Sequence, residues 1–207
     1  MQLAALMLIA ASYSIDSAHS SVGFAVKHLM VSTARGQFDR VTGRVEIDDA
    51  DLTRSRIDVT IEAASVNTRN AKRDEHLRST DFFDEATYPL ITFKSSYFEI
   101  ANGKLLASGN LTIQRVTRPV TLTIDSIAPP SKAPWGTWVR GATATGKLSR
   151  KDFGLRWNNR LENGGVVVGD EVQLTIDTEL VEETKGLQTR GASDSAAIEW
   201  GAEPCMS

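Results

Sequence analysis

The chain alternates between apolar and polar residues with a period of two from about residue 13 to residue 182. Gly, Asn, Asp and Pro separate the alternating segments. Because successive side chains of a strand point to opposite faces, this pattern predicts short β-strands with one apolar face each. The apolar positions are Val22, Phe24 and Val26; Ile57, Val59, Ile61 and Ala63; Ile91 and Phe93; Leu111 and Ile113; Val120, Leu122 and Ile124; Trp138, Ala142, Ala144 and Leu148; and Val172, Leu174, Ile176 and Leu180.

Local signals indicate how these strands connect. Asn102-Gly103 lies between two apolar runs, and both residues tolerate the positive φ that a type I′ hairpin turn requires. The apolar set that contains Phe38 has the opposite parity to the set that begins at Val41, so we expect a bulge or bend near Asp39-Arg40. At least two neighbouring strands are therefore antiparallel, and one strand bends.

Two segments depart from the strand pattern. Residues 70–77 are rich in Lys, Arg, Glu and His and contain no β-branched residue, which predicts a helical insert of one or two turns. Residues 183–207 carry scattered charges without a sustained period, so we expect a disordered tail. The remaining residues 13–182 form one predicted domain.

About eight antiparallel strands with one apolar face must close or stack, because that face needs cover and open edges promote aggregation. A β-sandwich and a closed barrel both satisfy this requirement. The apolar face mixes bulky Phe24, Phe38, Phe93 and Trp138 with small residues at positions 142, 144 and 146. Small residues leave room for an apolar guest inside a barrel, whereas the same residues also suit a dry, filled core.

Composition excludes several partners. The 207 residues carry a net charge of −3, with acidic and basic residues interspersed, so no single-sign field favours nucleic acid. No apolar run approaches the roughly 20 residues of a transmembrane helix. The only cysteine, Cys205, lies in the tail, which excludes an intramolecular disulfide and a cysteine metal site.

The first 12 residues resemble the end of an export signal. Residues 3–11 are mostly apolar, and Ala10, Ala11 and Ser12 suit signal cleavage. No Lys or Arg precedes the apolar stretch. We expect residues 1–12 to be a signal-peptide remnant or an N-terminal extension, and the protein to be periplasmic or secreted; a first strand or short helix in a cytoplasmic protein is the alternative.

The three histidines are candidate metal or acid–base groups. His19 and His28 are separated by about 30 Å if one strand connects them, and His76 falls on the predicted helix. This spacing argues against a metal site and favours a polar contact from His28 to a ligand head group. The pair Phe82-Phe83 predicts either an aromatic rim that gates the barrel or a plug at its end.

Catalysis has little support in the sequence. The chain contains no nucleophile elbow, phosphate-binding glycine loop or His-Glu-x-x-His helix. The acidic residues Asp48, Asp49, Asp51, Asp74 and Glu75 are typical of a solvated surface. We therefore predict no catalytic residue and no metal ligand, and we rank an enzyme that acts on an apolar guest in the barrel below the non-catalytic functions.

A series of short motifs resembles the YceI-like family. Each motif is weak alone, but their order and spacing are specific and they cover nearly the whole domain. They are Tyr13-Ser14-Ile15-Asp16-Ser17-Ala18-His19-Ser20, Phe24-Ala25-Val26-Lys27-His28, Gly36-Gln37-Phe38 with Gly43, Ser65-Val66-Asn67-Thr68, Asp74-Glu75-His76-Leu77, Asp81-Phe82-Phe83-Asp84, Tyr88-Pro89, Phe93-Lys94-Ser95, Gly109-Asn110-Leu111-Thr112-Ile113, Val116-Thr117-Arg118-Pro119-Val120, Ser149-Arg150-Lys151-Asp152-Phe153-Gly154 and Val168-Gly169-Asp170.

The resemblance implies an all-β fold, a closed antiparallel eight-stranded lipocalin-like barrel with a short helical insert. It also implies that the pore holds a polyisoprenoid or isoprenoid quinone without catalysis and without a cofactor, and that the protein is exported. By position, it assigns Phe24, Val26, Phe38, Phe93, Leu111, Ile113 and Phe153 to the pore lining. Together with His28 and Trp138, these residues form the predicted ligand-binding set.

The leading hypothesis is thus a carrier that shields an apolar isoprenoid lipid in its barrel. A stress-related structural or interaction module, with a barrel filled by its own side chains, is the alternative. No nucleic acid partner is expected, and a homodimer is compatible with the sequence.

Overall fold

A computed structural model describes residues 10–159 and 165–183. Most of the predicted signal segment and nearly all of the predicted tail lie outside these residues. Ala11 and Ser12 lie within them, in the first strand, opposite Ile47 and Glu46. The small residues that suit signal cleavage therefore overlap the start of the sheet.

Strands dominate the described residues, as the alternation predicts. The strands are β1 (Ala11–His28), β2 (Ser32–Phe38), β3 (Val41–Ile47), β4 (Arg56–Glu62), β5 (Val66–Asn67), β6 (Leu90–Ala101), β7 (Lys104–Ile113), β8 (Val116–Ile127), β9 (Ser131–Lys132), β10 (Trp138–Ser149) and β11 (Val168–Glu182); the helices are α1 (Ala71–Arg78) and the 3-10 turns η1 (Leu52–Arg54), η2 (Ala63–Ser65) and η3 (Arg150–Phe153).

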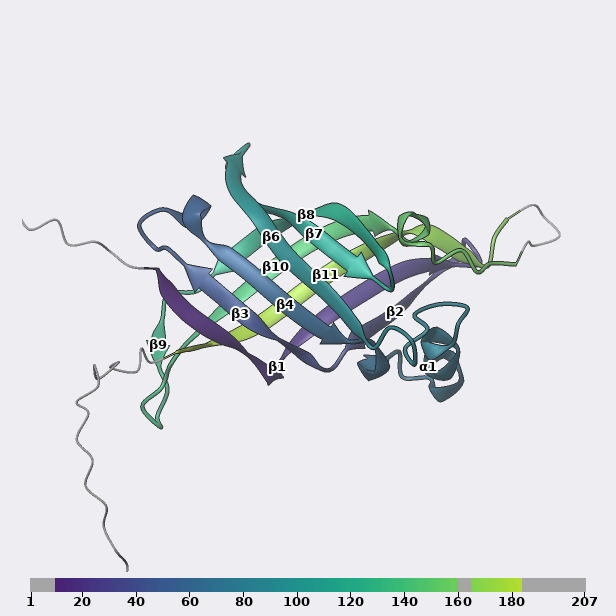
Figure 1. Ribbon diagram of the computed structural model, residues 1–207, viewed down its shortest axis with the longest axis horizontal. Helices are drawn as coiled ribbons and strands as arrows, with labels where there is room; N and C mark the ends of the chain where they lie inside the picture. Colours follow the sequence, from purple (N-terminus) through teal and green to yellow (C-terminus); the bar gives the residue numbers. More distant parts are fainter. Residues whose placement is uncertain (1–9, 160–164, 184–207) are drawn as a thin grey trace, which may run out of the picture.

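The sheet closes on itself. Its strand order runs β11-β10-β8-β7-β6-β4-β3-β1, and β11 pairs again with β1, so eight strands form a ring in which the pairings are antiparallel. The strands cross the barrel obliquely, with α1 at one end and β9 at the opposite end (Figure 1). The predicted closed eight-stranded antiparallel barrel is confirmed, and closure removes the open edges of the sheet.

β1 is the bent strand of the ring. Its first residues pair with β3 and its last residues with β2. Between these parts, residues 17–20 bulge opposite a single residue of β11, and Ser17 Oγ accepts a hydrogen bond of 3.2 Å from Val41 N. The break predicted near Asp39-Arg40 separates β2 from β3. The chain therefore bends between β2 and β3 at the point where β1 changes its pairing partner from one to the other.

The predicted helix and hairpin also form. Asn70 caps α1 by accepting a hydrogen bond of 3.1 Å from Arg73 N. The buried Asp74 accepts a hydrogen bond of 2.8 Å from Thr68 N, which ties the helix to the strand segment before it. Asn102 and Gly103 both have positive φ, of 52° and 73°, as the predicted turn requires.

The inward residues form one main core and a smaller cluster. The main core includes Phe38, Phe93, Leu111 and Phe153 with further aliphatic side chains. The smaller cluster consists of Tyr13, Ile47 and Leu180. The guanidinium of the buried Arg140 lies 5.6 Å from the centre of the Tyr13 ring, which is within the range of a cation–π contact.

Among the described residues, none of the helices has the length and apolar character needed to cross a membrane.

Gly109 marks a point where β6 and β7 approach too closely for a side chain. A Cβ atom at Gly109 would lie 2.7 Å from Ser95 Cα, next to an irregularity in the β6–β7 register. We predict that Gly109→Ala lowers the free energy of unfolding by about 2 kcal/mol, because backbone atoms must shift. Urea denaturation measures this change.

Gly141→Ala is the matched control, because the nearest atom to its Cβ would be Ala128 Cβ at 4.0 Å. We expect its unfolding midpoint to stay close to that of the wild type. Equal destabilisation by the two substitutions would contradict the close approach at Gly109.

Candidate functional site

The barrel encloses an apolar cavity of about 130 Å³. Every strand of the eight-membered ring contributes to its wall, and the wall contains no charged residue. Ser55, Thr143 and Thr178 are the polar residues among its lining. The apolar cavity is lined by Ile15, Val22, Val41, Val45, Ile47, Ser55, Ile57, Val59, Ile61, Phe93, Phe98, Leu111, Val120, Leu122, Ile124, Ile127, Ala142, Thr143, Ala144, Leu174, Ile176, Thr178 and Leu180.

A second, helix-side cavity has a volume of about 280 Å³. Residues of α1 and of the segments that follow it form part of its wall. It is lined by Val22, Phe24, Val26, Lys27, His28, Ala34, Arg35, Phe38, Ile61, Thr68, Arg73, His76, Leu77, Phe82, Phe83, Ile91, Leu111, Ile113, Leu148, Arg150, Leu155, Trp157, Val167, Val168, Val172 and Leu174.

The two cavities adjoin inside the barrel. Val22, Ile61, Leu111 and Leu174 line both of them. Together the cavities reach the range of small-molecule pockets, about 300–1,000 Å³. The interior therefore offers two adjoining spaces, one lined without charged residues and one on the side of α1.

Aromatic rings build the wall of the helix-side cavity. The ring centres of Phe38 and Phe83 are 5.4 Å apart, and those of Phe24 and Phe38 are 5.7 Å apart. The ring of His76 lies 5.0 Å from Phe82 and 4.8 Å from Trp157, edge to face in both cases. Phe82 and Phe83 thus belong to the cavity wall, at the barrel end where the sequence places a rim or a plug.

The helix-side cavity carries charge of one sign only. Its described lining includes the basic residues Lys27, His28, Arg35, Arg73, His76 and Arg150 and no Asp or Glu. Because the apolar cavity has no charged lining at all, the charged side chains that line these two cavities all belong to the helix-side cavity. Such an interior suits a molecule with an apolar body and a polar or anionic end.

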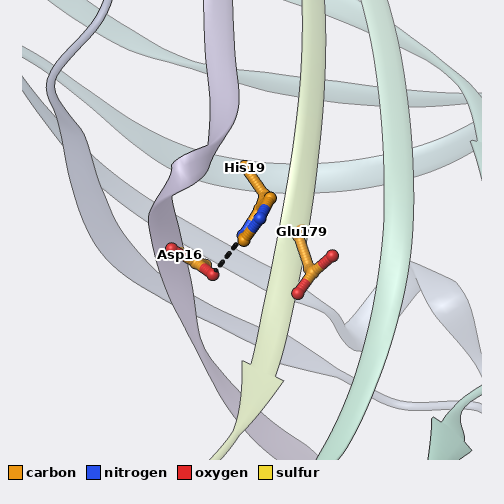
Figure 2. A group of neighbouring side chains, drawn as sticks. All are labelled: Asp16, His19 and Glu179. Atoms are coloured by element: carbon orange, nitrogen blue, oxygen red, sulfur yellow. Dashed lines mark hydrogen bonds and ion pairs between the residues drawn. The ribbon is translucent and has the colours of Figure 1, made fainter. Parts of the chain in front are cut away.

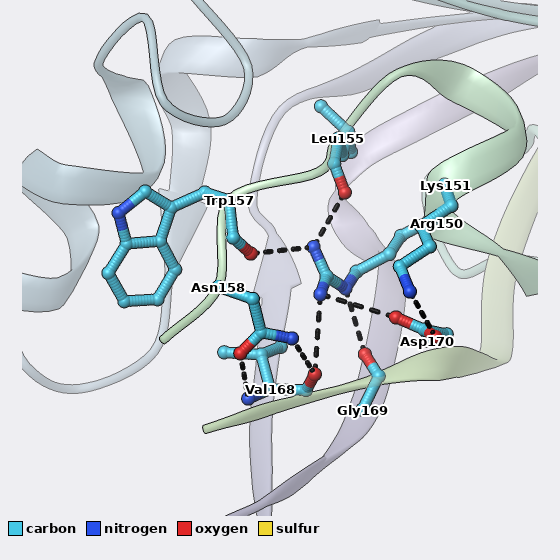
Figure 3. Close-up of polar contacts among 8 residues, drawn as sticks. All are labelled: Arg150, Lys151, Leu155, Trp157, Asn158, Val168, Gly169 and Asp170. Atoms are coloured by element: carbon cyan, nitrogen blue, oxygen red, sulfur yellow. Dashed lines mark hydrogen bonds and ion pairs between the residues drawn. The ribbon is translucent and has the colours of Figure 1, made fainter. Parts of the chain in front are cut away.

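Arg150 lines the helix-side cavity and makes a set of hydrogen bonds with the backbone around it (Figure 3). The Arg150 guanidinium donates hydrogen bonds to four backbone carbonyl oxygens, at 2.6 Å to Leu155, 2.9 Å to Trp157, 2.8 Å to Gly169 and 3.2 Å to Val168. Burial lowers the pKa of Arg150, partly opposed by the charge of Asp170. The guanidinium therefore joins the residues that follow η3 to the first residues of β11.

Most predicted pore residues reach a cavity wall. Phe93 lines the apolar cavity, Leu111 lines both cavities, and the helix-side cavity is lined by Phe24, Val26, His28, Phe38 and Ile113. His76, which the sequence analysis placed apart from His28, lines the same cavity as His28.

Two predicted pore residues lie elsewhere. Trp138 is 44% exposed and is absent from both linings, because the first residues of β10 pair with the short β9 beyond the end of the barrel ring. Trp138 has the same parity along β10 as Ala142 and Ala144, which line the apolar cavity, but it pairs with Lys132 of β9. Phe153 is 1% exposed and belongs to the main core, yet it lines neither cavity, because it lies on η3 and not on a barrel strand.

A side-chain cluster that the sequence analysis missed lies on the bulge of β1 (Figure 2). Asp16, His19 and Glu179 bring their donor atoms within 4.8 Å of one another. The Asp-x-x-His spacing is visible in the sequence, whereas Glu179 of β11 arrives only through barrel closure. His19 Nδ1 is hydrogen-bonded to Asp16 Oδ2 at 2.8 Å, so we interpret the cluster as an ion pair that stabilises the bulge.

The ion pair shifts the pKa values of both partners. The hydrogen bond that His19 donates to the Asp16 carboxylate, followed by the charges of Asp16 and Glu179, raises the pKa of His19 above its ordinary value. The hydrogen bonds that the Asp16 carboxylate accepts from His19 and from the backbone N–H of Ala18 lower the pKa of Asp16. Both groups are therefore charged across the pH range between the two shifted pKa values.

Comparisons with known proteins agree with this architecture. A sequence model of the YceI-like domain matches residues 13–180. A UPF0312 protein of Staphylococcus aureus is 35% identical over 168 residues, which cover 81% of this chain and 96% of that protein. The crystal structure of BcnA from Burkholderia cenocepacia superimposes with a TM-score of 0.68 and 25% identity, covering 80% of this chain and 98% of BcnA.

A more distant structural neighbour is a polyisoprenoid-binding domain from Saccharophagus degradans, with a TM-score of 0.58 and 17% identity over 84% of this chain and 99% of the domain. At that identity the likeness concerns the fold. The ring of strands and its interior cavities define a lipocalin-like barrel. Within that class, the chain belongs to the YceI-like family.

The Arg150 contacts predict a large loss of stability when the guanidinium is removed. In Arg150→Met, the carbonyl oxygens of Leu155, Trp157, Val168 and Gly169 lose their hydrogen-bond donor. We expect the free energy of unfolding to fall by about 3 kcal/mol, measured by urea denaturation.

Lys151→Met is the matched control, because Lys151 is half-exposed and its ion pair is with Asp170. Exposed ion pairs contribute about 0–1 kcal/mol, so this variant should unfold close to the wild type. A mild effect of Arg150→Met would mean that the carbonyl oxygens find other donors.

The ion pair on the bulge predicts an unusual histidine titration. In NMR titrations, the His19 ring should protonate with a midpoint above 6.5, and Asp16→Asn should lower that midpoint. Because the pKa of His19 is raised, the protonated ring stabilises the fold at low pH, and this stabilisation is lost as the pH rises through the pKa of His19. Because the pKa of Asp16 is lowered, the ionised carboxylate stabilises the fold at pH values above the ordinary pKa of Asp, and this stabilisation is lost as the pH falls through the pKa of Asp16. The pair therefore stabilises the bulge between the two pKa values.

Asp177→Asn is the control for this titration, since Asp177 lies on β11 two residues from Glu179 but is not among the groups that shift the pKa of His19. An identical His19 midpoint in the wild type and in Asp16→Asn would disprove the ion pair.

Proposed function

We propose that the protein binds a long apolar lipid, a polyisoprenoid or an isoprenoid quinone, inside the barrel without transforming it. The observation that carries this proposal is the apolar cavity, whose lining has no charged side chain and which shares Val22, Ile61, Leu111 and Leu174 with the helix-side cavity. Apolar groups gain about 0.8 kcal/mol for each buried methylene. A hydrocarbon tail therefore matches the chemistry of this wall.

The polarity of the interior suggests how the lipid is oriented. The tail lies in the apolar cavity, whose lining has no charged side chain. The head group lies in the helix-side cavity, where His28 offers its imidazole and His76, whose Nε2 is hydrogen-bonded to Asp81 Oδ2 at 2.9 Å, offers Nδ1. A few polar groups in an otherwise apolar pocket commonly fix ligand orientation.

Other proteins of this fold support the choice of ligand. The structural neighbour from Saccharophagus degradans is described as a polyisoprenoid-binding domain. We extend isoprenoid binding to this chain because its barrel keeps interior space and because its inner wall is apolar. The described linings contain no Asp or Glu, which favours binding over acid–base catalysis on the ligand.

The protein would carry the bound lipid after its own export from the cytoplasm. A lipid held inside a closed barrel is shielded from water, so the protein would move it through an aqueous compartment such as the periplasm. The self-filled module is less favoured, because side chains leave cavities of about 130 and 280 Å³ unfilled. We propose no cofactor beyond the bound lipid.

The decisive experiment extracts the protein, purified from its native host or a bacterial host, with organic solvent and identifies the co-purified lipid by mass spectrometry. A polyprenyl or quinone species near one-to-one stoichiometry would support the proposal. Protein that is free of lipid and also fails to take up added polyprenol in native mass spectrometry would support the self-filled module.

Substitutions in the cavity wall test where the lipid binds. Ala142 lines the apolar cavity, so Ala142→Phe should fill the space and reduce polyprenol uptake at least tenfold while the barrel still folds. Leu111→Arg places an unpaired charge in both cavities and should abolish uptake. Native mass spectrometry measures uptake, and circular dichroism verifies folding.

Asn110→Arg is the matched control, because Asn110 is exposed on the opposite face of β7 from Leu111. It should bind lipid as the wild type does. Undiminished uptake by a folded Ala142→Phe protein would refute the assignment of the tail to the apolar cavity.

A further inference from the structure

The hairpin between β1 and β2 ends in three exposed apolar residues. Leu29 is 37%, Met30 58% and Val31 84% exposed. We call Leu29, Met30 and Val31 the apolar tip. None of them lines the apolar cavity or the helix-side cavity, so interior packing does not account for their apolar character.

The backbone of the turn does not account for these residues either. Val31 N donates a hydrogen bond of 3.2 Å to His28 O, and the two central residues, Leu29 and Met30, have φ of 51° and 61°. Large side chains are unfavourable at such φ values, where Asn and Gly are preferred. The hairpin at Asn102-Gly103 has the favoured residues at the same positions, so the Leu29-Met30 turn is strained by comparison with it.

The apolar tip lies at the rim of the helix-side cavity. His28, the residue before the tip, lines that cavity. Leu29 N donates a hydrogen bond of 2.8 Å to the carbonyl oxygen of Val167, which lines the same cavity. Whatever the tip contacts is therefore brought next to the interior space.

Positive charge flanks the tip. Lys27 pairs with Thr33, and Ala25 pairs with Arg35, which places Lys27 and Arg35 on one face of the hairpin. Both basic residues are exposed, and neither has an ion pair with any described residue. Exposed apolar side chains with adjacent cations match the surface of an anionic bilayer, where negatively charged head groups cover apolar acyl chains.

We propose that the apolar tip inserts into the surface of an anionic lipid bilayer and holds the rim of the helix-side cavity against the membrane. Leu29, Met30 and Val31 enter the boundary between head groups and acyl chains, while Lys27 and Arg35 contact anionic head groups. This inference goes beyond lipid binding in the barrel, because it assigns a surface and a partner that the interior does not require.

The test is flotation of the full chain with vesicles of phosphatidylglycerol and phosphatidylcholine in equal amounts, compared with pure phosphatidylcholine. We expect binding to the anionic vesicles, weakened at high salt because the electrostatic part is screened. The Leu29→Asn/Met30→Gly double variant should lower vesicle binding at least tenfold. Its thermal midpoint should equal or exceed that of the wild type, because the variant has favoured turn residues.

Two further variants make the result specific. Lys27→Gln/Arg35→Gln should weaken binding to anionic vesicles and remove its salt dependence. Trp135→Asn changes a residue that is 75% exposed in the β9–β10 hairpin, at the opposite end of the barrel from α1 (Figure 1). It should leave vesicle binding unchanged.

Three results would overturn the proposal: no binding of the wild type to anionic vesicles, full binding by Leu29→Asn/Met30→Gly, or loss of binding in Trp135→Asn alone. Failure here is separable from failure of the barrel function, because polyprenol uptake from solution is measured on the same proteins. Since the apolar tip lines neither cavity, Leu29→Asn/Met30→Gly should take up lipid as the wild type does.

Discussion

The hydrogen-bonded ladder between β1 and β11 is the constraint on which the rest of the structure depends. It joins the first and last strands of the domain and turns an open sheet into a ring. An open sheet of this length would expose its apolar face and two edges. In the ring, that face becomes an interior, and its side chains become the walls of two adjoining cavities.

Closure also requires a strand that bends. β1 changes partner from β3 to β2 and bulges at residues 17–20, and the Asp16–His19 ion pair with neighbouring Glu179 forms at that bulge. The polar cluster on the outside is thus a consequence of the same bend that lets the sheet curl. The charged groups of this cluster lie on the outside of the barrel, and none of them lines the apolar cavity.

The two cavities differ in the charge of their linings, and this difference distinguishes one side of the barrel interior from the other. The α1 end gathers basic residues, aromatic rings and the Arg150 contacts around one cavity. The other part of the interior is lined by aliphatic and aromatic side chains without charge. A lipid with one polar end fits this polarity in a single orientation, and the apolar tip stands at the end where the head group would lie.

The sequence by itself determined the strands, the α1 insert, the Asn102-Gly103 hairpin and the bend before Val41, because these depend on local periodicity and turn chemistry. Side-chain parity along a strand is a local property, and seven of the nine residues that parity and the family resemblance assigned to ligand binding line a cavity. Closure was expected through resemblance to a family, while periodicity alone fitted a sandwich equally well. Only the tertiary structure decided where the pore ends, and therefore that Trp138 lies outside it.

The same reason explains the remaining differences. Glu179 joins Asp16 and His19 only through pairing across the whole length of the chain, and His28 meets His76 around one cavity only because α1 folds onto the barrel end. Contacts between distant segments depend on register and closure, which no local pattern encodes. The sequence determined which residues face inward, and the tertiary structure decided which of them border empty space.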